Sequence, residues 1–359
     1  MNEDCLKLTC YFGERDRAED RFLADALIDI FARHRFQVSV LMRGAEGFGL
    51  RHRLQTQRLL TLSEDLPLVA VAVDTRERVQ AALDEVTGVA GHGLITLERA
   101  RMLSAPVERA ELPAELDEAT KLTVYLGRQE RALNRPAYLA LVDLLHRRGI
   151  AGATVLLGVD GTTTGARQRA RFLGRNAEVP VMVIAVGDGA RVARVLPEAA
   201  ALLTRPLITL ERVRVCKRDG VRFAEPRHLP ATDPSGLAMW QKLMVYASEQ
   251  ARTAERPLYV ELVRRLRAEG AAGATVLRGI WGYHGDHTPH GDGFWSLRRH
   301  VPALTVVVDT PERIQRWWAI IDELTAETGL VTSEIVPAVR ASAPGHLAGG
   351  LRLAARWRD

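Results

Sequence analysis

One pattern occurs three times along this chain. Lys7–Gly13, Lys121–Gly127 and Lys242–Ser248 read KLTCYFG, KLTVYLG and KLMVYAS, and each begins a block the size of a small domain. LITLERARM, LITLERVRV and LVTSEIVPAV then recur near the ends of the three blocks. Three copies indicate that an object usually built by threefold association has been fused into one chain. The predicted domains are residues 1–103, 120–216 and 240–340, with linkers 104–119 and 217–239 and a loosely held tail, 341–359.

The composition is that of a globular protein without a membrane segment. Of 359 residues, 47% are hydrophobic and 26% are charged, and the net charge is only +5. No run reaches the roughly 18 apolar positions of a transmembrane helix, and MNEDCLKLTC lacks the features of a signal peptide. Cys5, Cys10 and Cys216 have neither metal-binding nor disulfide-framework spacing. We therefore expect a cytoplasmic protein with no membrane insertion.

Each copy predicts the same order of elements, β-α-β-β-α-β. In the second copy, residues 121–126 have strand character, and apolar residues recur at helical spacing over residues 136–148. A second strand ends at Gly44, Gly158 or Gly279, and a long loop leads to a third strand that begins at a proline. Loops of this length in compact domains are often functional. The pattern predicts an α+β fold of three tandem ferredoxin-like units.

The sequence around these glycines resembles a known family. The stretches LMRGAEGFG…TQRLLTLSEDLPLVAVAVDTRERV and GAAGATVLRGIWGYHGD…VPALTVVVDTPERIQ are similar to the DUF190 family, which is small and PII-like. An Arg-Gly-x-x-Gly-[Phe/Tyr] pattern is present at residues 43–48 and 278–283, whereas residues 157–162 read LGVDGT. The resemblance covers all three repeats, and it implies PII-like domains that form an intramolecular pseudo-trimer.

The resemblance also implies where ligands and partners bind. In PII-like proteins, small ligands, typically adenine nucleotides, bind in the clefts between neighbouring domains. The loops between the second and third strands contact protein partners. Some family members lie beside genes for fluoride-exporting channels, which makes a membrane transporter or channel a candidate partner. The lysine-bearing Gly-rich turn with which PII proteins bind nucleotide phosphate does not occur before the fourth strands, so a nucleotide is a candidate ligand without an assigned phosphate site.

Arginines and glycines near the expected clefts are the candidate ligand-binding residues. Period-2 spacing places the arginines of a fourth strand on one strand face, where they could meet phosphate or carboxylate, unless they protect an exposed edge strand. The glycines favour either a backbone that disfavours a Cβ atom or an anion-binding nest. The candidates are Arg43, Gly44, Gly47, Phe48, Arg99, Arg101, Gly158, Arg212, Arg214, Arg278, Gly279, Gly282 and Tyr283.

The long loops of the first two copies are basic. Their arginines could dock an acidic partner surface, or they could simply be solvated. The candidate partner-contact residues are Arg51, Arg53, Arg58, Arg167, Arg169, Arg171 and Arg175. The lysines that open the three copies, Lys7, Lys121 and Lys242, are expected to be solvated at the starts of their strands.

The long loop of the third copy has a different chemistry. His284, Asp286, His287 and His290 are ligand types that suit Zn²⁺ or another transition metal. The alternative is a polar, glycine-rich loop with incidental histidines, because nothing in the local sequence orients the rings.

These observations predict a PII-like, non-enzymatic regulatory protein that binds a small anionic ligand or nucleotide and contacts a protein partner. The alternatives are a metal-binding protein built on the third loop and a ligand-free structural adaptor. The chain has no P-loop, nucleophile elbow, His-Glu-x-x-His or Rossmann motif, which disfavours an enzyme. Aromatic residues make up 6% and do not interleave with the basic loops, which disfavours nucleic acid. Because the copies differ in chemistry, we predict three unequal clefts.

Overall fold

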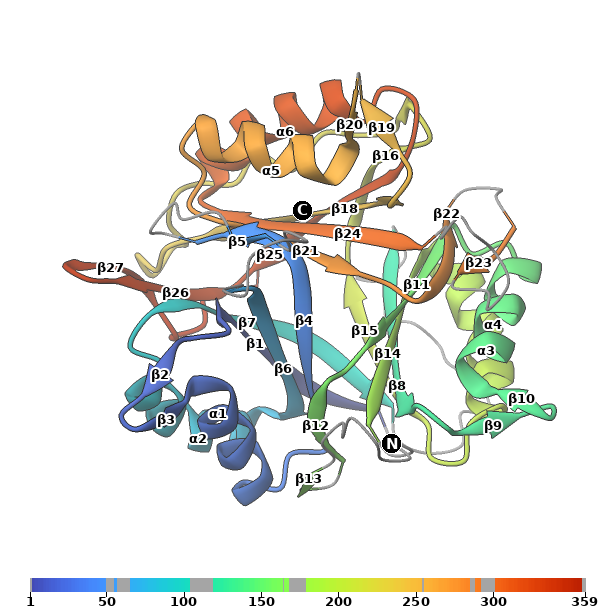
Figure 1. The fold of residues 1–359 in the computed structure, drawn as a ribbon, viewed down its shortest axis with the longest axis horizontal. Helices are drawn as coiled ribbons and strands as arrows, with labels where there is room; N and C mark the ends of the chain where they lie inside the picture. Colours follow the sequence, from blue (N-terminus) through green and yellow to red (C-terminus); the bar gives the residue numbers. More distant parts are fainter. Residues whose placement is uncertain are drawn as a thin grey trace.

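The computed structural model describes residues 2–49, 55–56, 65–103, 119–163, 165–167, 179–253, 255–284, 288–291 and 301–356. Three pairs of helices lie at three corners of the molecule, and the strands occupy the middle (Figure 1). Within the described part of the chain, no helix is long and apolar enough to cross a bilayer.

Each repeat forms one βαββαβ-like unit with a small hairpin before its first helix. The first consists of β1 (Asn2–Gly13), β2 (Arg17–Ala18), β3 (Arg21–Phe22), α1 (Leu23–Arg33), β4 (Val38–Phe48), β5 (Gln55–Thr56), β6 (Pro67–Thr75), α2 (Arg76–Val89) and β7 (Gly93–Leu103). The second consists of β8 (Thr120–Gly127), β9 (Arg131–Ala132), β10 (Arg135–Pro136), α3 (Ala137–Arg147), β11 (Gly152–Leu157), β12 (Asp160–Thr163), β13 (Ala166–Arg167), β14 (Pro180–Gly187), α4 (Gly189–Ala201) and β15 (Leu207–Arg212). After β16 (Arg214–Arg218) and β17 (Val221–Arg222), the third consists of β18 (Trp240–Ser248), β19 (Arg252–Thr253), β20 (Arg256–Pro257), α5 (Leu258–Ala268), β21 (Ala274–Arg278), β22 (Trp281–His284), β23 (His290–Gly291), β24 (Pro302–Asp309), α6 (Pro311–Leu324) and β25 (Leu330–Val336), and β26 (Ala338–Ala343) and β27 (His346–Gly350) follow.

The predicted α+β fold with three βαββαβ-like repeats is confirmed. In the first repeat the antiparallel order is β7-β1-β6-β4, and the other repeats have the same order. Because side chains alternate across a strand, each sheet has two faces to bury. One face packs under the helix pair of its own repeat. The other faces meet in a shared core, to which Val71, Ile184 and Val306 contribute from equivalent positions.

β11 ends at Leu157 and β21 at Arg278, directly before the glycines at which the sequence predicted the ends of these strands, whereas β4 continues to Phe48. In all three repeats the chain crosses onto a neighbouring repeat at or beyond the glycine. The continuation of β4 pairs with β21, β12 pairs with β4, and β22 pairs with β11, so the exchange is cyclic. A Cβ atom on Gly44 would lie 2.9 Å from the Val276 carbonyl oxygen, and one on Gly161 would lie 2.2 Å from that of Ser39. The repeated glycines therefore allow close contact between repeats.

The fourth strands, or the strands that follow them, also pair with a neighbouring repeat, but in the opposite direction around the molecule. The end of β7 pairs with β15, β16 pairs with β25, and β26 pairs with the start of β7. The expectation of a loosely held tail is therefore wrong, because β26 and β27 form a hairpin that extends the sheet (Figure 1). Farther along, the Ala354 amide donates to the Pro337 carbonyl at 2.8 Å, and Asp233 of the second linker accepts from the Ala355 amide at 2.6 Å.

Six charged side chains close a ring at the centre of the shared core. Each repeat contributes the lysine of its first strand and the glutamate opposite it on its fourth strand. These pairs are Lys7–Glu98 at 2.7 Å, Lys121–Glu211 at 2.9 Å and Lys242–Glu334 at 2.8 Å. Each lysine also reaches the glutamate of another repeat, in the pairs Lys7–Glu211, Lys121–Glu334 and Lys242–Glu98. Cations and anions therefore alternate around the whole ring.

The expectation that these lysines are solvated is wrong. Their side chains are only 9%, 2% and 3% exposed for Lys7, Lys121 and Lys242. Burial opposes charge on Lys7, but the carboxylates of Glu211 and Glu98 outweigh it and raise its pKa. Burial likewise opposes charge on Glu98, but the adjacent ammonium groups hold the pKa of that carboxyl well below its usual range.

These pKa shifts define the pH range over which the ring stabilises the fold. The lowered pKa of Glu98 contributes stability above its unfolded value, and this contribution is lost as the pH falls through the folded pKa. The raised pKa of Lys7 contributes stability below its unfolded value, and that contribution is lost as the pH rises through the folded pKa. The contributions of Glu98 and Lys7 are therefore both present at neutral pH. For Lys121, by contrast, burial outweighs the neighbouring carboxylates and lowers the pKa.

Removing one charged side chain of the ring should lower the stability of the fold more than removing a neighbouring lysine–glutamate pair. We expect Glu98→Gln to lower the free energy of unfolding by about 3–5 kcal/mol, because it leaves a buried ammonium uncompensated. Lys242→Met combined with Glu98→Leu keeps the ring neutral, so the double variant should lose less than the sum of its single variants. Chemical denaturation measures all of these free energies. Simple additivity would contradict an electrostatically coupled ring.

Candidate functional site

An open cleft lies between repeats 1 and 3, where β4 crosses onto β21 and β26 returns onto β7. It encloses a cavity of about 160 Å³. Its lining comes from both repeats and from the tail hairpin. The side chains that define it are Tyr11, Asp16, Phe48, Gln55, Asp65, His92 and Leu94 of repeat 1, Thr275, Val306 and Val308 of repeat 3, and Ser342 of β26.

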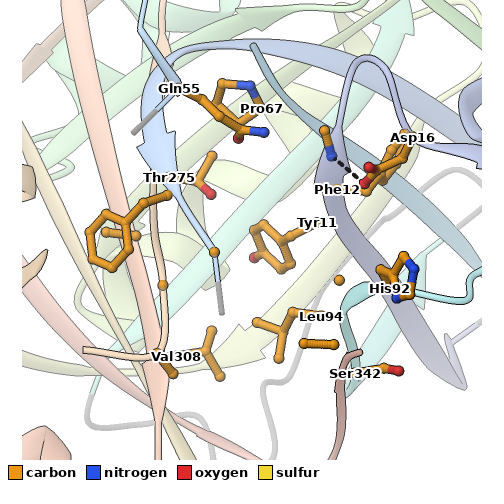
Figure 2. A pocket seen from close by; sticks show the side chains of 18 of the residues that line it. Tyr11, Phe12, Asp16, Gln55, Pro67, His92, Leu94, Thr275, Val308 and Ser342 are labelled. Carbon is orange, nitrogen blue, oxygen red and sulfur yellow. Dashed lines mark hydrogen bonds between the residues drawn. The ribbon is translucent and has the colours of Figure 1, made fainter. Parts of the chain in front are cut away.

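The cleft has a polar end and an apolar end. Figure 2 shows Tyr11 in the middle, with Asp16 on one side of it and Thr275 and Val308 on the other. Asp16 accepts a hydrogen bond from the Gly13 amide at 2.8 Å. Asp65 accepts one from the Arg15 amide at 3.1 Å and lies 3.4 Å from the Gln55 amide nitrogen. No lysine or arginine is among the described residues that line this cleft.

Tyr11 connects the cleft to the charged ring. It lies on the same face of β1 as Lys7, because the two residues are four positions apart on one strand. Burial raises the pKa of Tyr11, and the charges of Lys242 and Glu98 act on it as well. A molecule that contacts the Tyr11 side chain would therefore lie next to the electrostatic centre of the protein.

The equivalent positions at the other two boundaries are occupied by different side chains. Phe48, which lines the open cleft, corresponds to Tyr283 in repeat 3 and Thr162 in repeat 2. Tyr283 is buried against α3, and its hydroxyl donates to the Ile150 carbonyl at 3.0 Å. Thr162 forms a hydroxyl–hydroxyl hydrogen bond with Ser39 at 2.9 Å. The three boundaries therefore differ in shape and in chemistry.

A second hollow, of about 480 Å³, lies beside repeat 2 and the β16–β17 hairpin. Its basic groups have partners in its own wall. Arg191 donates to the Gly149 carbonyl at 2.9 Å, and Arg218 lies 3.8 Å from a carboxylate oxygen of Asp219. Asp219 also faces the ring of His284 at 3.2 Å. These contacts hold the basic side chains against the wall of the hollow.

Arg167 was predicted to contact a partner, but it binds carboxylates within the chain. Its guanidinium lies 2.6 Å from Asp25, 2.5 Å from Asp29 and 2.6 Å from Asp160. Asp25 and Asp29 belong to α1 of repeat 1, whereas Arg167 and Asp160 belong to repeat 2. The side chain therefore fastens two repeats together. Burial opposes its charge, but the three carboxylates raise the pKa of Arg167.

The position corresponding to Asp160 in repeat 1 is Glu46, and its environment is different. Glu46 is only 5% exposed, and it has no ion pair or hydrogen bond of its side chain among the residues that the structure describes. It lies on β4 opposite Val276 of β21. Burial raises the pKa of Glu46 to about 7. A buried carboxyl that ionises near neutral pH therefore lies at the boundary that carries the open cleft.

Most other predicted cleft residues lie away from the cavity. Arg43 and Arg278 form equivalent ion pairs with Glu14 and Glu249, both at 2.7 Å. Arg99 donates to the Ala354 carbonyl at 2.5 Å and so holds the tail. The remaining fourth-strand arginines, Arg101, Arg212 and Arg214, are half-buried. Gly44, Gly47, Gly279 and Gly282 lie where the backbone of a neighbouring repeat comes close. Gly158 lies between the Pro180 carbonyl of its own repeat and the Val40 side chain of repeat 1.

Several predicted residues fall outside the described part of the chain. These are Arg51, Arg53, Arg58, Arg169, Arg171, Arg175, Asp286 and His287. Of the proposed metal ligands, His284 is buried beside Asp219, and His290 Nδ1 lies 2.8 Å from the Thr288 carbonyl oxygen. In the described ranges, the carboxylates of Glu98, Glu211 and Glu334 come within 4.8 Å of one another, but each is already paired with lysines of the ring.

Sequence comparison identifies the family. A DUF190 profile, described as an uncharacterized ACR, matches residues 5–102, 119–215 and 240–338, so the chain belongs to this family. The chain is 30% identical over 98 residues to a UPF0166 protein of Aquifex aeolicus (strain VF5), across 27% of this chain and 90% of that protein. A crystal structure of aspartate kinase from Synechocystis aligns at a TM-score of 0.25 and 11% identity, over 94% of this chain and 52% of that one. That structural likeness is too weak to carry an argument.

Replacing Arg167 tests its role between repeats 1 and 2. We expect Arg167→Met to lower the free energy of unfolding by about 2–3 kcal/mol, because three carboxylates lose their shared cation. Arg135→Met is the matched control, since Arg135 pairs with Asp143 inside one repeat and is more exposed. It should cost about 0–1 kcal/mol. Equal losses in the two variants, measured by urea denaturation, would contradict the role assigned to Arg167.

Glu46 should make stability depend on pH. Because its folded pKa of about 7 is raised, the native state holds the proton more tightly than the unfolded chain does. Stability should therefore fall by about 3 kcal/mol as the pH rises from about 4.5 to 8. Glu46→Gln should remove this dependence of the free energy of unfolding on pH, whereas Glu14→Gln should retain it. Denaturation curves at several pH values measure the slope, and an unchanged slope in Glu46→Gln would exclude Glu46 as its source.

Proposed function

We propose that this member of the DUF190 family is a PII-like, non-enzymatic regulatory protein that binds a small molecule between repeats 1 and 3. The observation that carries the proposal is the open cleft at this boundary, where the equivalent positions elsewhere hold Tyr283 and Thr162. A pocket with an apolar body and a few convergent polar groups is typical of small-molecule sites.

The cyclic arrangement of the repeats supports a PII-like pseudo-trimer. Each boundary is formed by two exchanged strands that run in opposite directions around the molecule. PII-like proteins place ligands at such boundaries. The cleft is also lined by Gln55 of β5, which belongs to the segment between the second and third strands. Ligand binding would bias the conformation of this segment, and the segment would contact a protein partner.

The anionic ligand suggested by the sequence receives no support from the described lining. Asp16 and Asp65 supply negative charge, and the predicted arginines Arg43 and Arg99 are engaged elsewhere. The proposed function is therefore regulation through ligand binding, with a ligand that two carboxylates can accept.

Native mass spectrometry of freshly purified protein tests the proposal. We expect one chain with at most one bound small molecule, because the three boundaries are unequal. Ala343→Trp should remove this bound mass, because Ala343 lines the cleft. Leu347→Trp is the control, because Leu347 lies on the same hairpin, is 64% exposed and does not line the cleft.

Two results would overturn this function. Three equivalent bound molecules per chain would contradict a single open cleft. No bound mass, together with no thermal shift by ATP or by small organic cations and anions, would favour a structural adaptor. A ligand present at about 100 times its dissociation constant should stabilise the protein by about 2.7 kcal/mol, which a thermal scan detects readily.

A further inference from the structure

The side chains that line the cleft between repeats 1 and 3 indicate which ligand charge it favours. Both of its carboxylates lie beside Gly13, because Asp16 accepts from the Gly13 amide and a Cβ atom on Gly13 would lie 3.1 Å from an Asp65 oxygen. The hydrogen bonds within the chain occupy only some of the acceptor sites of each carboxylate. The polar end can therefore accept further hydrogen bonds from a ligand.

A polar side chain in the middle of the cleft, Tyr11, can also form a hydrogen bond with such a ligand. Tyr11 lies between the two ends, and its hydroxyl has no hydrogen-bond partner among the residues that the structure describes (Figure 2). A phenol hydroxyl can donate or accept. A ligand that crosses the cleft would therefore meet the Tyr11 hydroxyl and, beyond it, two anionic groups.

The apolar end limits the size of the ligand. Phe48, Leu94, Val306 and Val308 line this part of the cavity. Its volume of about 160 Å³ is close to that of an engineered apolar cavity of about 150 Å³ that binds benzene. One compact ring or branched aliphatic group would fill it, whereas the whole of a nucleoside triphosphate would not.

We propose that this cleft selects a compact organic amine, whose apolar body lies against Phe48 and Val308 and whose ammonium group lies between Asp16 and Asp65. The inference rests on the proposed function, since it names the ligand class of the same site. An ammonium satisfies the free acceptor sites and neutralises the two carboxylates. A carboxylate or phosphate ligand would instead add negative charge where no described lysine or arginine lines the wall.

Three probes of similar size and different charge test which ligand charge the cleft prefers. Benzylamine, which is an ammonium at neutral pH, should bind and raise the melting temperature. Benzyl alcohol should bind more weakly, and benzoate should bind at least about tenfold more weakly than benzylamine. Isothermal titration calorimetry at pH 8 measures all three affinities with the full chain.

Charge variants separate the carboxylates from general effects of net charge. Asp16→Asn with Asp65→Asn should weaken benzylamine roughly tenfold and reduce its preference over benzoate. Glu130→Gln is the matched control, because Glu130 occupies the position of Asp16 in repeat 2 and does not line the cleft. It should leave the benzylamine affinity unchanged. Circular dichroism and the unliganded melting temperature show whether each variant is folded.

The outcomes distinguish this inference from the proposed function. If benzoate or ATP binds and Ala343→Trp abolishes that binding, the cleft is a ligand site but the amine class is wrong. If benzylamine binds equally well to Ala343→Trp, it binds elsewhere and the inference fails. If none of the probes binds and no small molecule co-purifies, the proposed function fails together with the inference.

Discussion

The arrangement of the repeats depends on the ring of three lysines and three glutamates. Six buried charges are tolerable only while each is paired on both sides, because one unpaired charge in a dry core is costly. Lys7 reaches Glu98 of its own repeat and Glu211 of the next, and the other lysines repeat this connection. A chain with one repeat displaced would leave at least one ammonium and one carboxylate uncompensated. The ring therefore favours one cyclic order of the repeats over a string of independent domains.

Backbone geometry reinforces this electrostatic constraint. Gly44 and Gly161 let the second strands cross a neighbour at distances that no side chain would permit. The fourth strands cross back in the opposite direction, so every boundary is held by two ladders of backbone hydrogen bonds. Hydrogen bonds specify register, whereas the ring specifies which repeats meet. Neither constraint requires the clefts at the boundaries to be identical, because the ladders use backbone groups and allow the side chains of Phe48, Thr162 and Tyr283 to differ.

The sequence repeats made the fold predictable, but the contacts between repeats could not be predicted from the sequence. Element order could be read from apolar spacing, prolines and glycines because these features act within one unit. Lys121 looked like a solvated residue at a strand start, since its two partners, Glu211 and Glu334, are distant in the sequence. The persistence of this lysine and of a glutamate in all three copies was the available signal. The ion pairs of Arg167 could not be predicted for a similar reason, because a basic loop reveals nothing about carboxylates on a helix of another repeat.

Fusion into one chain explains how a symmetric scaffold can carry one specialised cleft. In a homotrimer, a substitution that opens one boundary must open all three, because symmetry repeats it. Here the same position can be Phe48 beside a cavity, Thr162 in a hydrogen bond and Tyr283 in the core of its neighbour. The two filled boundaries retain the packing that stabilises the assembly. The open boundary loses some of that packing, but it places Tyr11, and through it the charged ring, within reach of a ligand.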